Sequence, residues 1–119
     1  MKYALLIYGN SEVLARVPEE ERRRVNAGIA EILARSNVPD HLRLQGPDSA
    51  TTVRYEQGRT LLTDGPFVDS KDFLGGFIIV EADDLDGALA VAGELQELRA
   101  AGVGPIEVRP VNEEQLVRA

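Results

Sequence analysis

The chain has no cysteine and only one histidine. The lack of cysteine excludes disulfides, thiol catalysis and thiolate metal sites. The one histidine, His41, directly follows Asp40, and an adjacent aspartate is not the orienting partner that a catalytic triad needs. We therefore expect His41 to be a surface residue rather than a catalyst.

Motifs for cofactors and metals are also missing. The sequence contains no histidine-rich or cysteine-rich metal spacing, and neither a G-x-G-x-x-G nor a Walker sequence. The sequence does not exclude a Mg²⁺ ion held by carboxylates, but no pattern predicts one. We predict no cofactor and no metal site.

Positive charge is scarce, since the formal net charge is −7. Nucleic-acid binding draws its affinity from clusters of lysine and arginine, so this balance argues against a nucleic-acid partner. The one dense basic run, residues 22–24, follows three glutamates. Glu19 with Arg23 and Glu20 with Arg24 are spaced to pair one helical turn apart, which predicts a solvated helix face.

Long apolar runs are missing as well. The longest one near the N-terminus, Ala4–Tyr8, is too short for a signal-peptide core or a membrane span. We expect a cytoplasmic protein with no membrane partner. The 119 residues, 44% of them apolar and 28% charged, are typical of one globular domain, so we predict a single domain over 1–119.

Short apolar runs predict the strands. Lys2–Tyr8 and Phe77–Val80 are continuous runs typical of central strands. Ala50–Tyr55 and Thr60–Thr63 predict a hairpin, because both are rich in β-branched residues and a glycine turn separates them. Ile106–Val111 alternates, and the proline near its end indicates an edge strand or a strand terminus.

Two helices are predicted between these strands. The first runs from about Pro18 to Ser36 behind an apolar stripe at helical spacing. The second is capped by Asp83 and ends at Gly102 and Gly104. Its expected buried stripe is Leu85, Leu89, Ala92 and Leu95, widened by Ala88. An extra short strand is possible around residues 41–44.

The resulting order, β-α-β-β-β-α-β, predicts an α+β fold. Two helices separated by strands fit a ferredoxin-like, split βαβ plan, in which an antiparallel sheet carries both helices on one face. The other face of such a sheet would leave apolar side chains in water. We expect dimerisation through the sheets, which would form a dimeric α/β barrel.

The segment 63–76, TDGPFVDSKDFLGG, is the densest candidate site. Asp64 with the following glycine and proline is a strong turn signature, and we expect Phe67 to plug into the core. Lys71 lies between two aspartates, and Gly75–Gly76 predicts the close approach of another backbone or a ligand. The segment can be a ligand-binding loop or only a connection between strands.

Two arginines in strand-like sequence are further candidates. Arg54 and Arg109 are suited to hold a carboxylate or phosphate with the bidentate guanidinium fork. The alternative for both is a position on the solvent face of a strand or an ion pair, for example with Glu107.

Four separated motifs resemble the YCII-related family, in its DGPF-domain branch. They are Met1–Tyr8, Ala50–Arg54, Asp64–Phe67 with Lys71 and Leu74–Gly76, and Ile106–Val111. The resemblance implies a ferredoxin-like fold that dimerises through its sheet. It also implies links to breakdown of small molecules, such as dehydrochlorination, and to extracytoplasmic-function sigma factors. A His-Asp pair is proposed as catalytic in the better-studied branch, but the predicted first helix has no histidine, so the pair does not carry over.

Two functions follow. In the first, a small and possibly anionic molecule binds in a cleft beside the DGPF loop. Asp64 would be the acid/base or hydrogen-bond acceptor, Arg54, Lys71 or Arg109 would grip the anion, and the activity would be lyase- or hydrolase-like. In the second, the chain is a non-catalytic module that acts with a sigma factor.

Overall fold

The computed structural model describes residues 1–99 and 103–113, and its fold is α+β with an antiparallel sheet, as predicted. The strands are β1 (Lys2–Asn10), β2 (Asp40–Arg43), β3 (Thr51–Glu56), β4 (Arg59–Asp64), β5 (Asp72–Glu81) and β6 (Ile106–Pro110). The helices are α1 (Ser11–Leu14), α2 (Glu19–Arg35) and α3 (Leu85–Leu98), with a short 3-10 turn at Pro47–Ser49. The short helix α1 was not predicted.

The main sheet has four strands in the order β2-β5-β1-β6, and every neighbouring pair is antiparallel. The two continuous apolar runs form the central strands β1 and β5, as predicted, and one face of each strand contributes to the core. The proline-ended strand β6 lies at one edge, as predicted, and the extra short strand β2 at the other. Gly76 of β5 pairs with Ile7 on one side and Arg43 on the other.

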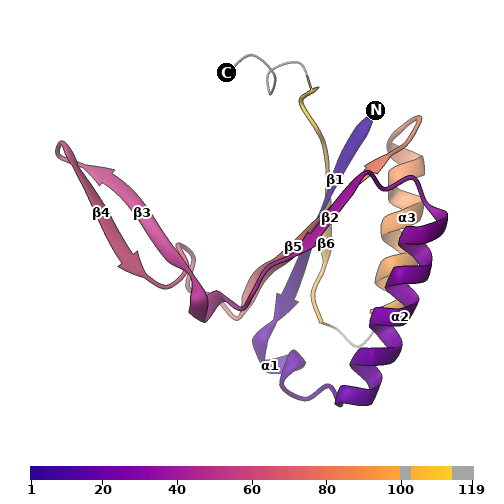
Figure 1. Cartoon of the computed structure of the whole chain (residues 1–119), viewed down its shortest axis with the longest axis horizontal. Coiled ribbons are helices and arrows are strands. Elements are labelled where there is room, and N and C mark those ends of the chain that lie inside the picture. The colour runs from indigo at the N-terminus through magenta and orange to yellow at the C-terminus, as the bar shows by residue number, and fades with distance from the viewer. Residues whose placement is uncertain (100–102, 114–119) are drawn as a thin grey trace.

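Helices α2 and α3 cover one face of this sheet (Figure 1). The core between the two layers consists of Tyr3, Leu5, Ile32, Ile78, Val80, Ala88, Ala92 and Leu95. The stripe predicted for α3 is only partly right, since Leu85 and Leu89 are each 45% exposed. The buried side of α3 is instead formed by Ala88, Ala92 and Leu95, and the small alanines let the helix lie close to the sheet.

The helix ends differ in detail from the predictions. Asp84 rather than Asp83 caps α3, and its carboxylate accepts a hydrogen bond of 2.9 Å from the backbone N–H of Gly87. Helix α3 ends at Leu98, while the predicted stop at Gly102 lies outside the described residues.

The predicted charged face of α2 is confirmed, but one of its two ion pairs has a different partner. Glu19 and Arg23 form the expected ion pair at 3.1 Å. Arg24 pairs with Glu21, three residues earlier, at 3.7 Å instead of with Glu20. All of these side chains are well exposed, so each pair adds little stability.

The predicted hairpin is confirmed, but β3 and β4 form a separate two-stranded sheet. It projects from the main sheet on the side away from α2 and α3 (Figure 1). Because it leaves the main body, Phe67 does not plug into the core as predicted: its side chain is 73% exposed, and the Arg54 guanidinium lies 5.5 Å from the ring centroid.

The face of the main sheet away from the helices carries an apolar strip. Side chains alternate along each strand, so Ala4, Leu6, Leu42, Phe77 and Ile79 lie on this face. The chain is flat, with principal extents of 48 × 41 × 18 Å. Its radius of gyration of 16.3 Å exceeds the about 13.5 Å typical of a compact domain of this length.

Within the described residues, no helix is both long and apolar enough to cross a membrane.

Candidate functional site

A cavity of about 400 Å³ lies on the helix side of the main sheet, where β1, β2 and β5 meet α1, α2 and the end of α3. Its size is within the about 300–1,000 Å³ of small-molecule sites. The walls are mainly apolar and include Ile7, Leu14, Val25, Ile29, Phe73 and Leu98. The cavity can therefore hold a small molecule with an apolar part.

The strand registers explain how these walls are built. Phe73 of β5 lies opposite Gly9 of β1, and the ring occupies the space that a side chain at Gly9 would need. Arg43 of β2 pairs with Gly76, and its side chain emerges on the helix side of the sheet. The end of the segment 63–76 thus forms part of the cavity through Phe73 and Gly75.

Arg99 is the most buried cation of the cavity. One terminal nitrogen donates a hydrogen bond of 2.6 Å to the carbonyl oxygen of Tyr8, and the other donates one of 3.2 Å to the side chain of Gln96. Burial lowers the pKa of Arg99 below its ordinary value, and the positive charge of Arg43 lowers that pKa further. The two guanidinium groups thus lie close enough for their positive charges to repel each other.

Two more arginines line the same cavity, Arg22 and Arg43. Arg43 donates a hydrogen bond of 3.1 Å to the Asn26 side chain, and Arg22 donates one of 2.9 Å to the Leu14 carbonyl oxygen. Within residues 1–99 and 103–113, none of the three cavity arginines forms an ion pair with a carboxylate. Guanidinium groups have five N–H donors each, so most of these donors are available to a ligand.

One acidic residue, Glu21, also lines the cavity, but its carboxylate pairs with Arg24. The charged lining residues are therefore three arginines and one glutamate. On a chain with a net charge of −7, this is a local concentration of positive charge. Such a site attracts small anions.

A smaller cavity of about 100 Å³ adjoins the first and is lined by His41. The two cavities share Ile7, Ile29, Arg43, Gly75 and Arg99. His41 and Arg43 are two residues apart on β2, so their side chains lie on the same face of the strand. His41 is exposed, as predicted, yet it borders the arginine pair.

The predicted site residues Arg54 and Asp64 both lie on the projecting hairpin, outside the lining of either cavity. Asp64 ends β4 opposite Thr51. The turn after it is held by its backbone: Gly65, with a φ of 104°, donates to the Ala50 carbonyl at 2.8 Å. The DGPF turn thus fastens the base of the hairpin.

Lys71 and Arg109, the other two predicted site residues, lie apart from the hairpin strands and from each other. Lys71 forms an ion pair of 2.8 Å with Glu12 of α1. Arg109 is on the edge strand β6, where its Nε donates a hydrogen bond of 2.9 Å to Glu107. An ion pair with Glu107 is the alternative to ligand binding that the sequence predicts for Arg109. Neither lines the cavities. The ligand-binding roles of all four residues stay predictions.

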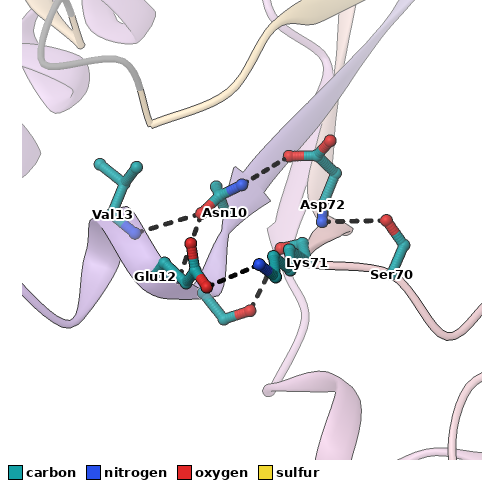
Figure 2. Close-up of polar contacts among 7 residues, drawn as sticks. Asn10, Glu12, Val13, Ser70, Lys71 and Asp72 are labelled. Carbon is teal, nitrogen blue, oxygen red and sulfur yellow. Dashed lines mark hydrogen bonds and ion pairs between the residues drawn. The ribbon is translucent and has the colours of Figure 1, made fainter.

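A network of polar contacts ties the end of β1 to the segment before β5 (Figure 2). The Asn10 amide donates to the Asp72 carboxylate at 2.9 Å, and its oxygen accepts from the backbone N–H groups of Glu12 and Val13 at 3.1 and 3.2 Å. The Lys71–Glu12 ion pair closes the same network. This network positions α1, whose Leu14 lines the cavity.

Sequence reasoning missed Arg43 and Arg99. One signal was available for Arg43, because it alternates with His41 in the short segment predicted as an extra strand. Arg99 at the end of a helix has an ordinary explanation, since cations are favoured there. Its position beside Arg43 depends on packing between distant segments. No group of three or more metal-ligating side chains occurs among the described residues.

The chain belongs to the YCII-related domain family, whose sequence model matches residues 1–115. This confirms the family predicted from the motifs, while the DGPF branch stays a prediction. An uncharacterized protein of Rhizobium meliloti is 32% identical over 115 residues, which are 93% of this chain and 92% of that protein.

Two solved structures are more distant. The 5-chloro-2-hydroxyhydroquinone dehydrochlorinase TftG of Burkholderia phenoliruptrix, in complex with 2,5-dihydroxybenzoquinone, is 17% identical, with 94% of each chain covered and a TM-score of 0.49. The divalent cation tolerance protein Cut A1 of Thermus thermophilus is 16% identical, with 97% of this chain and 88% of that chain covered and a TM-score of 0.34. At these TM-scores neither likeness carries an argument about this chain.

Proposed function

We propose that the chain binds a small anionic molecule in the cavity between the main sheet and α2, with Arg43 and Arg99 as its cationic contacts. The observation that carries the proposal is the placement of these two arginines beside one another in a mostly apolar cavity. Like charges in such surroundings repel, and an anion between them would remove both the repulsion and part of the desolvation cost.

The test is a thermal-shift and NMR titration screen of matched small molecules. Carboxylates, sulfonates and phosphate monoesters are compared with neutral amides of the same carbon skeleton. Anions are expected to raise the melting temperature and to shift the amide signals of β2 and of residues near Arg99, whereas the amides have no effect. A panel in which no anion binds, or in which amides bind as well as acids, contradicts the proposal.

A lyase- or hydrolase-like activity is the catalytic form of the same proposal, with His41 as the acid/base group. Histidine is the side chain most often used for proton transfer in enzymes, and His41 borders the arginine pair. With a substrate that the chain turns over, His41→Gln is expected to lower kcat by about a hundredfold or more while anion affinity changes little. Unchanged kcat in this variant would exclude His41 as the catalyst.

We further propose that the chain is a ferredoxin-like homodimer that pairs through the bare face of the main sheet. The strand order β2-β5-β1-β6 supports the ferredoxin-like part of this proposal. In the split βαβ plan, as here, the two central strands β1 and β5 lie side by side and β2 and β6 lie at the edges. The apolar strip on the bare face and the flat shape indicate a missing second layer. The hairpin supports it too, since Val53, Tyr55 and Leu62 are 64–74% exposed and an isolated hairpin is only marginally stable.

Leu42→Glu is expected to convert the dimer into a monomer at micromolar concentration, because the variant places a charge in the proposed interface, opposite Phe77 of β5. Leu42 is 42% exposed in the single chain, so the substitution costs the fold itself little. Leu89→Glu on α3 is the matched control, since Leu89 is 45% exposed but lies outside the sheet. Light scattering measures both masses. A monomeric wild type, or a dimer that persists in Leu42→Glu, contradicts the proposal.

A further inference from the structure

We infer that the ligand of the cavity is an amphipathic carboxylate, a molecule with an apolar body and a carboxylate at one end. This inference rests on the proposed anion site and names the class of ligand. The cavity has two different ends: Arg43 and Arg99 lie where it adjoins the smaller cavity, while the rest is mainly apolar and includes Leu14, Val25 and Phe73. The two charged residues of this second part are already engaged, Arg22 by the Leu14 carbonyl oxygen and Glu21 by Arg24.

The cationic end fits a carboxylate. Guanidinium groups present paired N–H donors that match the two oxygens of a carboxylate. Arg99 donates to the Tyr8 carbonyl oxygen and to the Gln96 side chain, and Arg43 donates to the Asn26 side chain, so each guanidinium keeps further N–H donors for a ligand. A carboxylate carries one negative charge, and its burial in a partly apolar site costs less than the burial of a doubly charged phosphate.

A phosphate ester fits this cavity less well. Phosphates in proteins are commonly held by the exposed backbone N–H groups at a helix N-terminus. The first turn of α2 instead carries Glu19, Glu20 and Glu21, and Glu21 lines the cavity. These carboxylates occupy the position that favours anions, and they repel a doubly charged phosphate more strongly than a singly charged carboxylate.

The apolar walls fit a hydrocarbon body. Most of the side chains around the cavity have no polar atoms, so a ligand body with hydroxyl groups would lose hydrogen bonds to water without replacement. Val25 and Phe73 lie on opposite layers, the helix and the sheet, and both would contact the body. Each added methylene therefore gains affinity until the cavity is full.

The experiment measures the affinities of straight-chain carboxylates from acetate to octanoate, together with alkyl phosphates and amides of equal length. Affinity is expected to rise about two- to fourfold for each methylene. Alkyl phosphates are expected to bind at least about tenfold more weakly than carboxylates of the same length, and amides not to bind.

A matched pair of variants tests the apolar end of the cavity. Val25→Thr keeps the size of the side chain but replaces a methyl group with a hydroxyl, and it is expected to weaken octanoate about three- to tenfold with little effect on short acids. Val68→Thr, at a residue that is 65% exposed and lines neither cavity, is expected to leave the whole series unchanged. Circular dichroism checks that both variants are folded.

The outcomes distinguish the two proposals. If phosphates bind more tightly than long carboxylates, or if affinity does not rise with chain length, the inference about the ligand class is wrong while the anion site stands. If no anion of any kind binds, both are wrong. If Val25→Thr leaves the dependence on chain length intact, the hydrocarbon body does not occupy the cavity and the inference is overturned.

Discussion

Gly76→Ala is expected to lower the free energy of unfolding by about 3 kcal/mol, the upper end of the cost of overpacking. Gly76 lies at the centre of the sheet between β1 and β2, and a methyl group there would collide with the carbonyl oxygen of Leu42 in the neighbouring strand. A backbone atom held in a strand cannot move aside as a flexible side chain can. Strand β2 must therefore shift or detach.

The same variant is expected to lose anion binding, because β2 supplies Arg43 and, among residues 1–99 and 103–113, β5 is its one strand neighbour. Urea unfolding measures the stability, and titration with octanoate measures the affinity. Hydrogen exchange of the β2 amides is expected to accelerate more than that of β1.

Gly93→Ala is the matched control for this prediction. Gly93 is an exposed residue within α3, and a methyl group added there meets nothing within 4 Å. Alanine favours helix over glycine, so this variant is expected to gain about 0.5–1 kcal/mol. Equal stabilities of the two variants would contradict the role of Gly76 in seating β2.

Arg99→Gln is expected to weaken the binding of octanoate about a hundredfold. A hydrogen bond to a charged group is worth about 1.5–3 kcal/mol, and each 1.4 kcal/mol corresponds to about a tenfold change in affinity. Burial raises the value of the Arg99 contact, whereas Arg43 is more exposed, so Arg43→Gln is expected to cost about tenfold. Arg99→Lys keeps the charge without the fork of donors and is expected to lie between wild type and Arg99→Gln.

Arg23→Gln provides the control for the loss of one positive charge. Arg23 lies on α2 and pairs with Glu19, and neither residue lines the cavity. Its loss is expected to change the affinity less than about twofold. Because Arg99 also holds the Tyr8 carbonyl, unfolding curves accompany each titration, and Arg43→Gln tests the site independently of that contact. Equal affinities in the Arg23 and Arg43 variants would contradict the proposed site.

Much of the fold could be predicted from local patterns. The runs at Lys2–Tyr8 and Phe77–Val80 are apolar without alternation, which is typical of central strands, and both occupy that place in the sheet. The prediction that Gly75–Gly76 marks a close approach is confirmed by the Leu42 carbonyl beside Gly76. The position of Phe67 could not be predicted, since its exposure depends on the direction in which the β3–β4 hairpin projects from the main sheet.

The candidate site could not be predicted in the same way. Arg43 and Arg99 come from the edge strand β2 and the end of α3, and only the antiparallel pairing of β2 with β5 and the contact of Arg99 with Tyr8 place them at one cavity. Neither lies in a motif with turn or catalytic signatures. The segment 63–76 drew attention because its turn residues are needed for backbone conformation, as the φ of 104° at Gly65 indicates.

The most direct test of the anion site is a crystal structure of the protein with octanoate. The carboxylate is expected within hydrogen-bond distance of the guanidinium groups of Arg43 and Arg99, with the hydrocarbon chain between Val25 and Phe73. Octanoate bound instead at Arg54, Asp64, Lys71 or Arg109, with the cavity free of it, would contradict the proposed site.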